Sequence, residues 1–321
     1  MKRCLPLLLT ATIVFAAPKP PAEVYLDADK AGPDFAVQGE YVGETAAKLG
    51  GDKLAAQIVA EGDGKFTAYF LAGGLPGDGW DGKRKVKAAA HTADGKTTFD
   101  GAGWKGEIAD GKLTGTRDDG VEFHLTHVLR KSPREGAKPP DGARVLFDGT
   151  NVDEWKNGKI VEDMLLGQGA TTKRTFRDFV LHVEFRLPFR PKAHGQERGN
   201  SGVYLQRRYE IQVLDSFGLA GDKSECGAVY EQTPPAVNMC YPALSWQTYD
   251  IDFQAARYDA DGKKTADAVV TVIHNGVKVH DHQDVPTKTG YGDKEADTPG
   301  PINLQDHGNP VYFRNVWVIE K

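Results

Sequence analysis

The sequence predicts an all-β protein in which a small antiparallel β domain precedes an antiparallel two-sheet sandwich. Three observations indicate this fold class: Asp-Gly dipeptides recur through the first part of the chain, apolar and polar residues alternate in the second part, and no helical periodicity of useful length appears. Asp-Gly supplies the positive φ angles of tight hairpin turns, and alternation is the period of a half-buried strand. Parallel βαβ architecture needs helices between its strands, so the sequence does not favour it.

The first residues have the pattern of a secretory signal peptide. Two early cations precede an apolar run over residues 5–17, and small residues stand at Ala16 and Ala17. That run is too short to cross a bilayer, and no later stretch approaches about 18 consecutive apolar residues. We therefore expect a signal peptide of residues 1–16, export to the periplasm or the extracellular space, and no membrane span.

Residues 22–130 are expected to form the small β domain, whose role the sequence does not indicate. Segments such as 65–71 and 121–128 are apolar or aromatic and are bounded by turn residues, which is typical of short antiparallel strands. The segment 48–60 is the one that favours a helix, although two glycines interrupt it.

Residues 143–321 are expected to form the sandwich, after a linker at 131–142 that is rich in Pro, Gly and charge. The segment 179–187 alternates most clearly, because its odd positions are apolar and its even positions are mostly polar. Further strands are expected at 246–253, 268–274, 277–280 and 311–319, with Asn275-Gly276 as a type I′ turn between two of them.

The composition argues against nucleic acid and anionic membranes as partners, and it leaves open whether two cysteines form a disulfide. The formal charge is -5, with no block of like charge, whereas nucleic acid or an anionic membrane requires a basic stripe. We therefore expect neither as a partner. Cys226 and Cys240 remain after signal-peptide removal, and in an oxidising compartment they are candidates for a disulfide. Two buried thiols are the alternative.

Polar stripes run along several predicted strands of the sandwich. The stripes are His182, Glu184 and Arg186; Gln206, Arg208, Glu210 and Gln212; and Asn303, Gln305 and His307. Amides, carboxylates and guanidinium groups suit a polyhydroxylated ligand, because each sugar hydroxyl both donates and accepts hydrogen bonds. Trp155, Trp246 and either Tyr230 or Tyr241 are candidates for stacking on a sugar ring. An ordinary solvated face with cross-strand ion pairs is the alternative.

The register of one strand decides which residues share a face. If Arg207-Arg208 is a hairpin turn, Gln206 does not share a face with Glu210, whereas Glu210 and Gln212 stay together in either case. Asp215 joins the same site only if the strand stops or bulges there.

A conventional glycosidase requires a pair of carboxylates across the scissile bond. A strand with acids at alternate positions would supply them, but the middle position here is Gln212 and the next is Leu214. Glu184 and Glu210 on neighbouring strands are the remaining candidate pair.

Seven motifs in the second domain carry a resemblance to a known family. They are LFDGTNVDEW at 146–155, DFVLHVEFR at 178–186, GNSGVYLQRRYEIQVLDS at 199–216, CGAVYEQTPPAVN at 226–238, SWQTYDIDF at 245–253, HNGVKVHD at 274–281 and INLQDHGNPVYFRNVWV at 302–318. In this order they resemble the 3-keto-disaccharide hydrolase domain family over residues 143–321. The resemblance implies a concanavalin A-like jelly-roll sandwich and an enzyme that cleaves glycosidic bonds.

The chemistry of the family implies an unusual route to bond cleavage. A keto group at C3 of the sugar acidifies the hydrogen at C2, so the bond at C1 breaks by elimination through an enolate, and water then adds. This route needs one base, a group that assists the leaving oxygen, and donors near the C3 oxygen.

The resemblance implies roles for particular residues. Glu210 is the candidate base, with His307 as the alternative base or as the acid for the leaving oxygen. Glu184 is the candidate second acid. The candidate substrate-binding residues are Asn200, Arg208, Gln212, Asp215, Tyr230, Trp246, Gln305 and Arg314, although Arg314 also suits a structural ion pair.

The expected partner is a carbohydrate, an oxidised 3-keto-glycoside. No cofactor is implied, and a divalent metal shared by His and Glu side chains stays open. A non-catalytic carbohydrate-binding sandwich is the rival function, because sandwich scaffolds host both and the fold does not choose between them.

Overall fold

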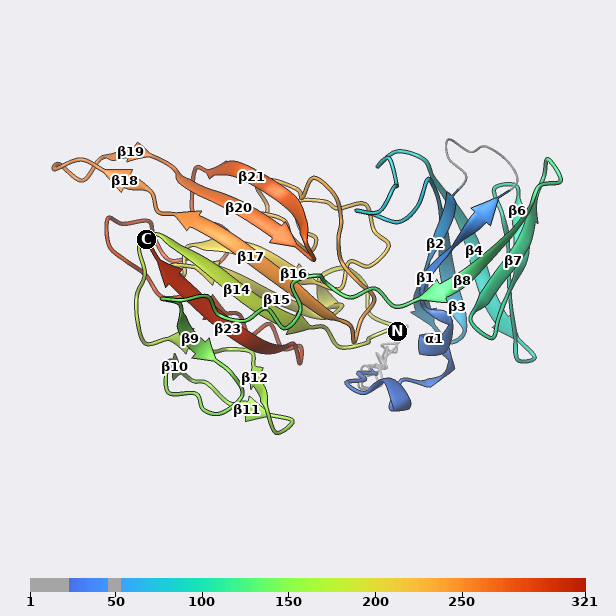
Figure 1. Ribbon diagram of the computed structural model, residues 1–321, viewed down its shortest axis with the longest axis horizontal. Coiled ribbons are helices and arrows are strands. Elements are labelled where there is room, and N and C mark those ends of the chain that lie inside the picture. The colour runs from blue at the N-terminus through green and yellow to red at the C-terminus, as the bar shows by residue number, and fades with distance from the viewer. Residues whose placement is uncertain (1–22, 46–52) are drawn as a thin grey trace, which may run out of the picture.

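The protein, described from a computed structural model, is almost entirely β (Figure 1). The structure describes residues 23–45 and 53–321, so the predicted signal peptide lies outside the described residues. Helix in this part of the chain is confined to α1, Gly32–Val37, and two short 3-10 turns. All pairs of named strands are antiparallel, which confirms the predicted all-β antiparallel class. No helix of the described ranges is long and apolar enough to cross a membrane.

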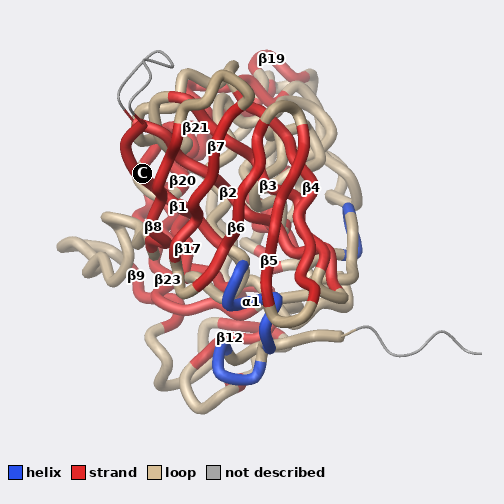
Figure 2. The backbone as a smooth tube through the Cα atoms, turned by 90° about the vertical axis from the view of Figure 1, so that its right-hand side faces the viewer, coloured by secondary structure: helices blue, strands red, loops and turns tan. Residues whose placement is uncertain are grey.

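Strands β1 to β8 form a closed barrel, in which each strand pairs with the next and β8 pairs with β1 (Figure 2). Aromatic rings fill its interior: Phe70 stacks on Trp104 at 4.4 Å between ring centroids and also contacts Phe99 and Phe123. The strands are β1 Gly39–Thr45, β2 Lys53–Gly62, β3 Lys65–Ala72, β4 Lys85–Ala93, β5 Lys96–Gly101, β6 Trp104–Ala109, β7 Lys112–Arg117 and β8 Glu122–Val128.

The helix expected at 48–60 is wrong, because β2 occupies most of that segment. Between residues 54 and 60, β2 is buried on both faces: Ile58 packs inside the barrel, whereas Ala55 packs outside it against Leu71 and Leu75. A strand that is buried on both faces is apolar throughout, so its period of two is hidden in the sequence.

Two further sheets form the sandwich. The five-stranded sheet has the order β10-β13-β22-β15-β16, and the second sheet has the order β11-β12-β23-β14-β17-β20-β21, with β9 paired to β23. The first sheet contains β10 Trp155–Lys156, β13 Thr171–Thr172, β22 Asn303–Leu304, β15 Asn200–Leu205 and β16 Tyr209–Leu214. The second contains β9 Arg144–Phe147, β11 Ile160–Val161, β12 Leu165–Gly167, β14 Phe179–Arg186, β17 Trp246–Gln254, β20 Ala268–His274, β21 Val277–Val285 and β23 Tyr312–Glu320. A small pair, β18 Arg257–Tyr258 and β19 Lys264–Ala266, stands apart.

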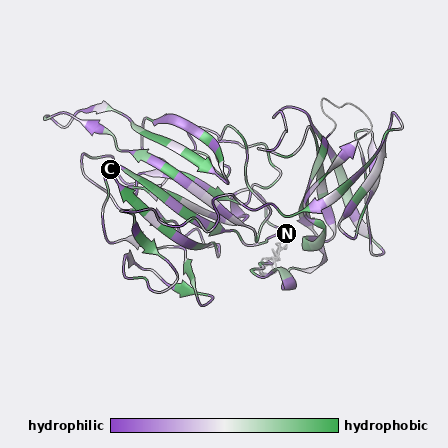
Figure 3. Cartoon of the chain, viewed as in Figure 1, coloured by the Kyte–Doolittle hydropathy of each residue, from purple (hydrophilic) through white to green (hydrophobic). Residues whose placement is uncertain are grey.

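The two sheets enclose one core, and along their strands hydrophobic residues alternate with hydrophilic ones (Figure 3). Tyr209 of β16 packs on Phe253 of β17 at 5.6 Å between ring centroids. The odd positions of β14 and of β16 lie in this core, so the even positions of both strands point away from it. The stripe with Glu184 and the stripe with Glu210 therefore face opposite sides of the sandwich.

The segment that joins barrel and sandwich is bound along the outer face of the second sheet. The Ser132 hydroxyl lies 2.7 Å from the Thr248 hydroxyl, the Arg134 guanidinium pairs with Asp250, and the Trp317 indole N–H donates to the carbonyl of Ala137. These contacts cover the stripe that contains Glu184.

A buried ion pair joins the barrel to the strand that carries Glu210. Arg198 Nε donates to Asp215 Oδ2 over 2.8 Å, and Arg198 Nη1 donates to the carbonyl of Ala60 in β2 over 3.0 Å. Asp215 directly follows β16, so this contact fixes one end of that strand against the barrel.

Candidate active site

The hairpin of β15 and β16 sets the geometry of the site. Gln206 and Arg207 both have a φ of 55°, and the Arg208 N–H donates to the carbonyl of Leu205. The chain therefore turns at these residues, and the register places Tyr204 directly opposite Glu210. Cross-strand partners share a face, so the Tyr204 and Glu210 side chains lie together on the outer face of the five-stranded sheet.

Glu210 is an almost fully buried carboxyl whose surroundings oppose its ionisation. It is 2% exposed, and this burial raises the pKa of Glu210 from 4.5 to about 7. The Tyr204 hydroxyl lies against the carboxyl and opposes the shift only in part. The carboxyl can therefore change its protonation state near neutral pH, as a general base must.

Two glycines make room for the Glu210 carboxyl. A Cβ atom at Gly202, on the facing strand, would lie 2.1 Å from Glu210 Oε1, and one at Gly290 would lie 3.3 Å from Oε2. The same Gly290 position is 3.2 Å from the Tyr230 ring, so Tyr230 also borders the carboxyl. Larger residues at these two positions would displace either the carboxyl or the backbone that encloses it.

The loop at 287–296 closes over the turn of the hairpin. The Thr289 hydroxyl accepts a hydrogen bond from the Glu210 N–H, and the Thr289 N–H donates to the carbonyl of Arg208. The Arg208 guanidinium donates to the carbonyl of Thr298 over 2.8 Å and is nearly buried. The Arg208 Nε also donates to the carbonyl of Lys294 over 3.3 Å, so Arg208, predicted to bind substrate, holds this loop and the residues just after it.

A cavity of about 350 Å³ adjoins Tyr204. Gln305 lines it and is fixed beside the hairpin, because its N–H donates to the carbonyl of Gly202 over 2.9 Å. The Tyr204 hydroxyl and Gln305 Oε1 are buried, and neither has a hydrogen-bond partner of ordinary geometry among the described residues. The lining residues are Asn157, Gly169, Thr171, Tyr204, Arg207, Tyr291, Asn303, Gln305, Asp306 and His307.

Unsatisfied buried polar atoms are costly, and in native proteins they usually find a ligand or water. The two such atoms at this cavity, one hydroxyl and one amide oxygen, suit a hydroxylated ligand. The Tyr291 ring, 86% exposed at the same cavity, offers a flat apolar face for a sugar ring.

A second set of amides lies on the same face as Glu210. Asn200 Nδ2 donates to Gln196 Oε1 over 2.9 Å, and Gln212 Nε2 donates to the same oxygen over 3.1 Å. Gln196 therefore orients both predicted substrate-binding amides. Gln196 lies in a short 3-10 turn outside the alternating strands, so no sequence pattern marks it as a site residue.

Three other predicted residues gather on the opposite side of the sandwich. The carboxylate of Glu184 is fully buried and accepts hydrogen bonds from Arg314 over 2.7 Å and Asn315 over 2.8 Å. The Arg314 guanidinium also lies 3.8 Å from the centroid of the Trp246 ring. The structure thus does not bring Glu184, Arg314 and Trp246 together with Glu210.

Hydrogen bonds give Glu184 the opposite titration behaviour from Glu210. Burial alone would raise its pKa, but the hydrogen bonds from His182, Asn315, Arg314 and the Gly136 N–H outweigh burial and lower the pKa of Glu184 to about 2. Glu184 is therefore an ionised structural carboxylate that binds the segment at 131–137 to the sheet.

The remaining predicted residues have defined places. Asp215 is paired with Arg198, as described, and His307 lies exposed at the rim of the cavity. Cys226 and Cys240 are buried free thiols, which is the second of the two alternatives that the sequence left open. Within the described ranges, no group of three His, Cys, Asp or Glu side chains could hold a metal ion.

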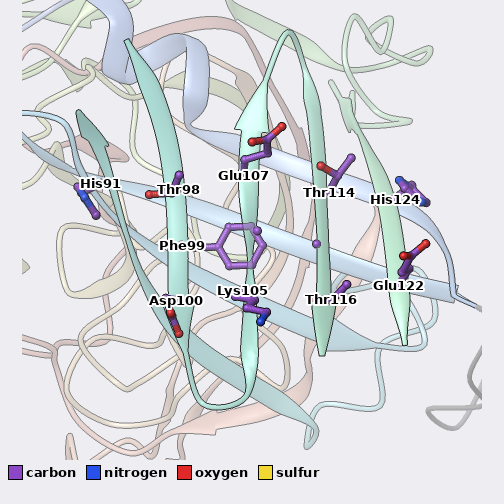
Figure 4. Close-up of a pocket in the computed structure, with 12 residues that line it drawn as sticks. His91, Thr98, Phe99, Asp100, Lys105, Glu107, Thr114, Thr116, Glu122 and His124 are labelled. Carbon is purple, nitrogen blue, oxygen red and sulfur yellow. The ribbon is translucent and has the colours of Figure 1, made fainter. Parts of the chain in front are cut away.

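A wider hollow of about 720 Å³ lies on the barrel (Figure 4). Polar side chains such as Thr98, Glu107 and His124 surround the bare backbone of Gly106 and Gly115. None of its described lining residues has a buried polar atom that lacks a partner. The hollow therefore shows less of the character of a ligand site than the smaller cavity beside Tyr204.

Comparisons with known proteins match the sandwich part of the chain. The family described as the 3-keto-alpha-glucoside-1,2-lyase-like domain matches residues 142–319. A solved structure from Parabacteroides distasonis, provisionally named a glycosyl hydrolase, is 34% identical, with a TM-score of 0.52, and the match covers 57% of this chain and 85% of that one. A second structure from the same organism, with the same provisional name, is 20% identical with a TM-score of 0.41 over 60% of this chain and 98% of its own. No curated protein sequence matches the chain.

Glu210→Gln is expected to stabilise the protein at alkaline pH. Because the folded-state pKa of Glu210 is raised above its unfolded value, the stability linked to the neutral carboxyl is complete below about pH 4.5 and is lost as the pH rises to about 7. A shift of this size corresponds to at most about 3 kcal/mol of unfolding free energy. The amide cannot ionise. The free energy of unfolding in urea, taken as variant minus parent, should therefore increase between pH 5 and pH 8. The same difference in unfolding free energy between variant and parent at pH 5 and at pH 8 would contradict the raised pKa of Glu210.

Proposed function

The chain belongs to the family of 3-keto-alpha-glucoside-1,2-lyase-like domains, and on this premise we propose that it cleaves the glycosidic bond of a 3-keto-glycoside at Glu210. One observation carries the proposal. Glu210 is a buried carboxyl with a pKa near 7, beside the Tyr204 hydroxyl and close to the polar cavity that Tyr204 lines. General bases work best when their pKa lies near the operating pH.

The proposed reaction begins with proton transfer. The Glu210 carboxylate removes the hydrogen from C2, and the electron pair moves toward the C3 oxygen to form an enolate. Once Glu210 holds the proton, its carboxyl competes less for the neighbouring Tyr204 hydroxyl, which donates a hydrogen bond to the C3 oxygen as its charge grows.

Elimination follows from the enolate. The C1–O bond breaks, its electron pair goes to the leaving oxygen, and that oxygen takes a proton from His307 at the cavity rim. Water then adds across the C1–C2 double bond: its hydroxyl goes to C1, and C2 regains a hydrogen from the protonated Glu210. These steps return both residues to their starting protonation states once His307 has recovered its proton from water.

The position of Glu184 argues against a conventional two-carboxylate mechanism that uses the pair considered from the sequence. Such a mechanism needs the two carboxyls about 5 to 10 Å apart across the substrate. Glu184 lies on the far face of the other sheet and is bound by Arg314 and Asn315. Elimination requires one base and hydrogen-bond donors, and we assign these roles to Glu210 and to its cross-strand partner Tyr204, which lines the adjoining cavity.

We also propose that the protein is exported, because the first sixteen residues have the pattern of a signal peptide. An exported enzyme of this kind would act after an oxidoreductase that converts the C3 hydroxyl of a glycoside into a ketone. The finer jelly-roll topology of the sandwich belongs to the same proposal, since it rests on the family.

Purified protein is expected to release the aglycone from a 3-keto-glucoside and not from the parent glucoside, because only the ketone acidifies C2. Glu210→Gln should lower the rate by about 10² to 10⁴-fold, which is the usual contribution of a general base. Chromatography of the released aglycone measures both the preference for the 3-keto substrate and the rate of the variant. Glu320→Gln, at an exposed carboxyl near the end of the chain, is the matched control and should keep the parent rate.

Binding of the 3-keto-glucoside without turnover would favour the non-catalytic carbohydrate-binding function. Cleavage of the parent glucoside at a comparable rate would contradict elimination. Full turnover in Glu210→Gln would contradict the assignment of the base.

Tyr204→Phe is expected to slow the reaction and to shift its pH dependence. The base must be ionised, so kcat/KM should rise with pH through about 7. The Tyr204 hydroxyl lowers the pKa of Glu210, and its removal should move this rise to higher pH. Loss of one enolate donor should also lower kcat by about 10² to 10³-fold.

Tyr258→Phe provides the matched control, because Tyr258 also has a buried hydroxyl without a partner among the described residues, in another part of the sandwich. If kcat/KM plotted against pH has the same midpoint and the same plateau in Tyr204→Phe as in Tyr258→Phe, the proposed role of Tyr204 is contradicted.

A further inference from the structure

The barrel contains a cavity that is separate from the Glu210 site. The cavity measures about 380 Å³ and lies at the end of the barrel where β3 and β7 finish and β4 and β6 begin. Its floor is apolar: Leu54, Phe70 and Trp104 are each at most 7% exposed. The Phe70 and Trp104 rings stack at an interplanar angle of 17°. A floor of this kind suits the apolar body of a small organic ligand, and barrel mouths are frequent ligand sites.

The wall of the same cavity carries an incompletely paired cation. Arg117, the last residue of β7, is the cross-strand partner of Trp104, and its guanidinium carbon lies 5.4 Å from the Trp104 ring centroid. Arg117 Nη2 pairs with Asp119 over 2.8 Å. Arg117 Nη1 is buried and has no hydrogen-bond partner in the described part of the chain. One donor of the guanidinium is therefore available to a ligand in the cavity.

The other charged side chains that line the cavity are all cations. Lys83, Arg84 and Lys85 line it together with Arg117, and none of the described lining residues is acidic. Arg84 pairs with Asp81, and the Lys85 ammonium group donates to the carbonyl of Gly218. Asp81 therefore offsets the charge of Arg84, whereas Lys85 donates to an uncharged carbonyl and still contributes positive potential at the cavity.

We propose that this barrel mouth binds a small amphipathic anion, a carboxylate on an aliphatic or aromatic body. The carboxylate would accept a hydrogen bond from Arg117 Nη1, and the body would cover the rings of Phe70 and Trp104. A neutral apolar ligand would leave Nη1 unpaired, and an inorganic anion would leave the apolar floor exposed. A sugar fits poorly, because the lining side chains include no carboxylate and no amide to accept from its hydroxyl groups.

This proposal does not depend on the proposed function. All the residues that carry it belong to the barrel, and the proposed reaction uses residues of the sandwich. It gives the barrel a binding role of its own.

Isothermal titration of the full chain with decanoate and with decanol tests the proposal. Decanoate is expected to bind at a single site about tenfold more tightly than decanol, the factor that one charge-assisted hydrogen bond supplies. Arg117→Gln should reduce the affinity for decanoate about tenfold and leave that for decanol unchanged. Lys112→Gln, at the exposed start of the same strand, is the matched control and should bind decanoate like the parent.

A second variant tests the apolar part of the cavity. If Arg117→Gln does not fold, this variant shows whether decanoate binds in the barrel cavity. Ala72→Leu adds side-chain volume to the lining and should weaken both ligands at least tenfold. Absence of saturable decanoate binding to the parent would overturn the proposal. Unchanged decanoate affinity in Arg117→Gln, or in Ala72→Leu, would overturn it equally.

Discussion

The register of the hairpin formed by β15 and β16 is the constraint on which the site depends. It sets Glu210 opposite Tyr204 and Gln212 opposite Gly202, with the Glu210 carboxyl lying over the glycine. A slip of one residue would turn Glu210 into the apolar core of the sandwich. The left-handed conformations of Gln206 and Arg207 fix this register, and the buried pair of Arg198 and Asp215 fixes the far end of the strand against the barrel.

Two glutamates show how the same residue type acquires different chemistry on two faces of one sandwich. Glu184 is buried among donors, which lower its pKa to about 2 and make it a permanent ionic anchor for the segment at 131–137. Glu210 is buried with a single weak donor beside it, and its pKa rises to about 7. Burial is common to both, so the number of hydrogen bonds to the carboxylate separates the structural group from the candidate base.

The sequence was sufficient for the longer strands of the sandwich, because alternation over 179–187 and 209–214 follows directly from one buried face, whereas short strands such as β10 to β13 carry no such period. It could not separate Glu184 from Glu210, since both stand at polar positions of alternating strands. What distinguishes them is a segment more than 40 residues upstream of Glu184 that covers only one of the two sheets. Tyr204 was also missed as a site residue, because an aromatic residue in a strand is usually part of the core. The position of its hydroxyl beside the Glu210 carboxyl becomes visible only in three dimensions.

In the proposed reaction, Glu210 breaks the C2–H bond of a 3-keto sugar before the glycosidic bond is lost. The most direct test compares kcat/KM for a 3-keto-glucoside that carries hydrogen at C2 with that for the same substrate carrying deuterium at C2, at a pH above 7 where Glu210 is ionised. Elimination with rate-limiting proton removal predicts a slower reaction of the deuterated substrate, with deuterium lost from C2 of the unhydrated intermediate. Equal rates, with deuterium fully retained at C2 of the product, would contradict the account.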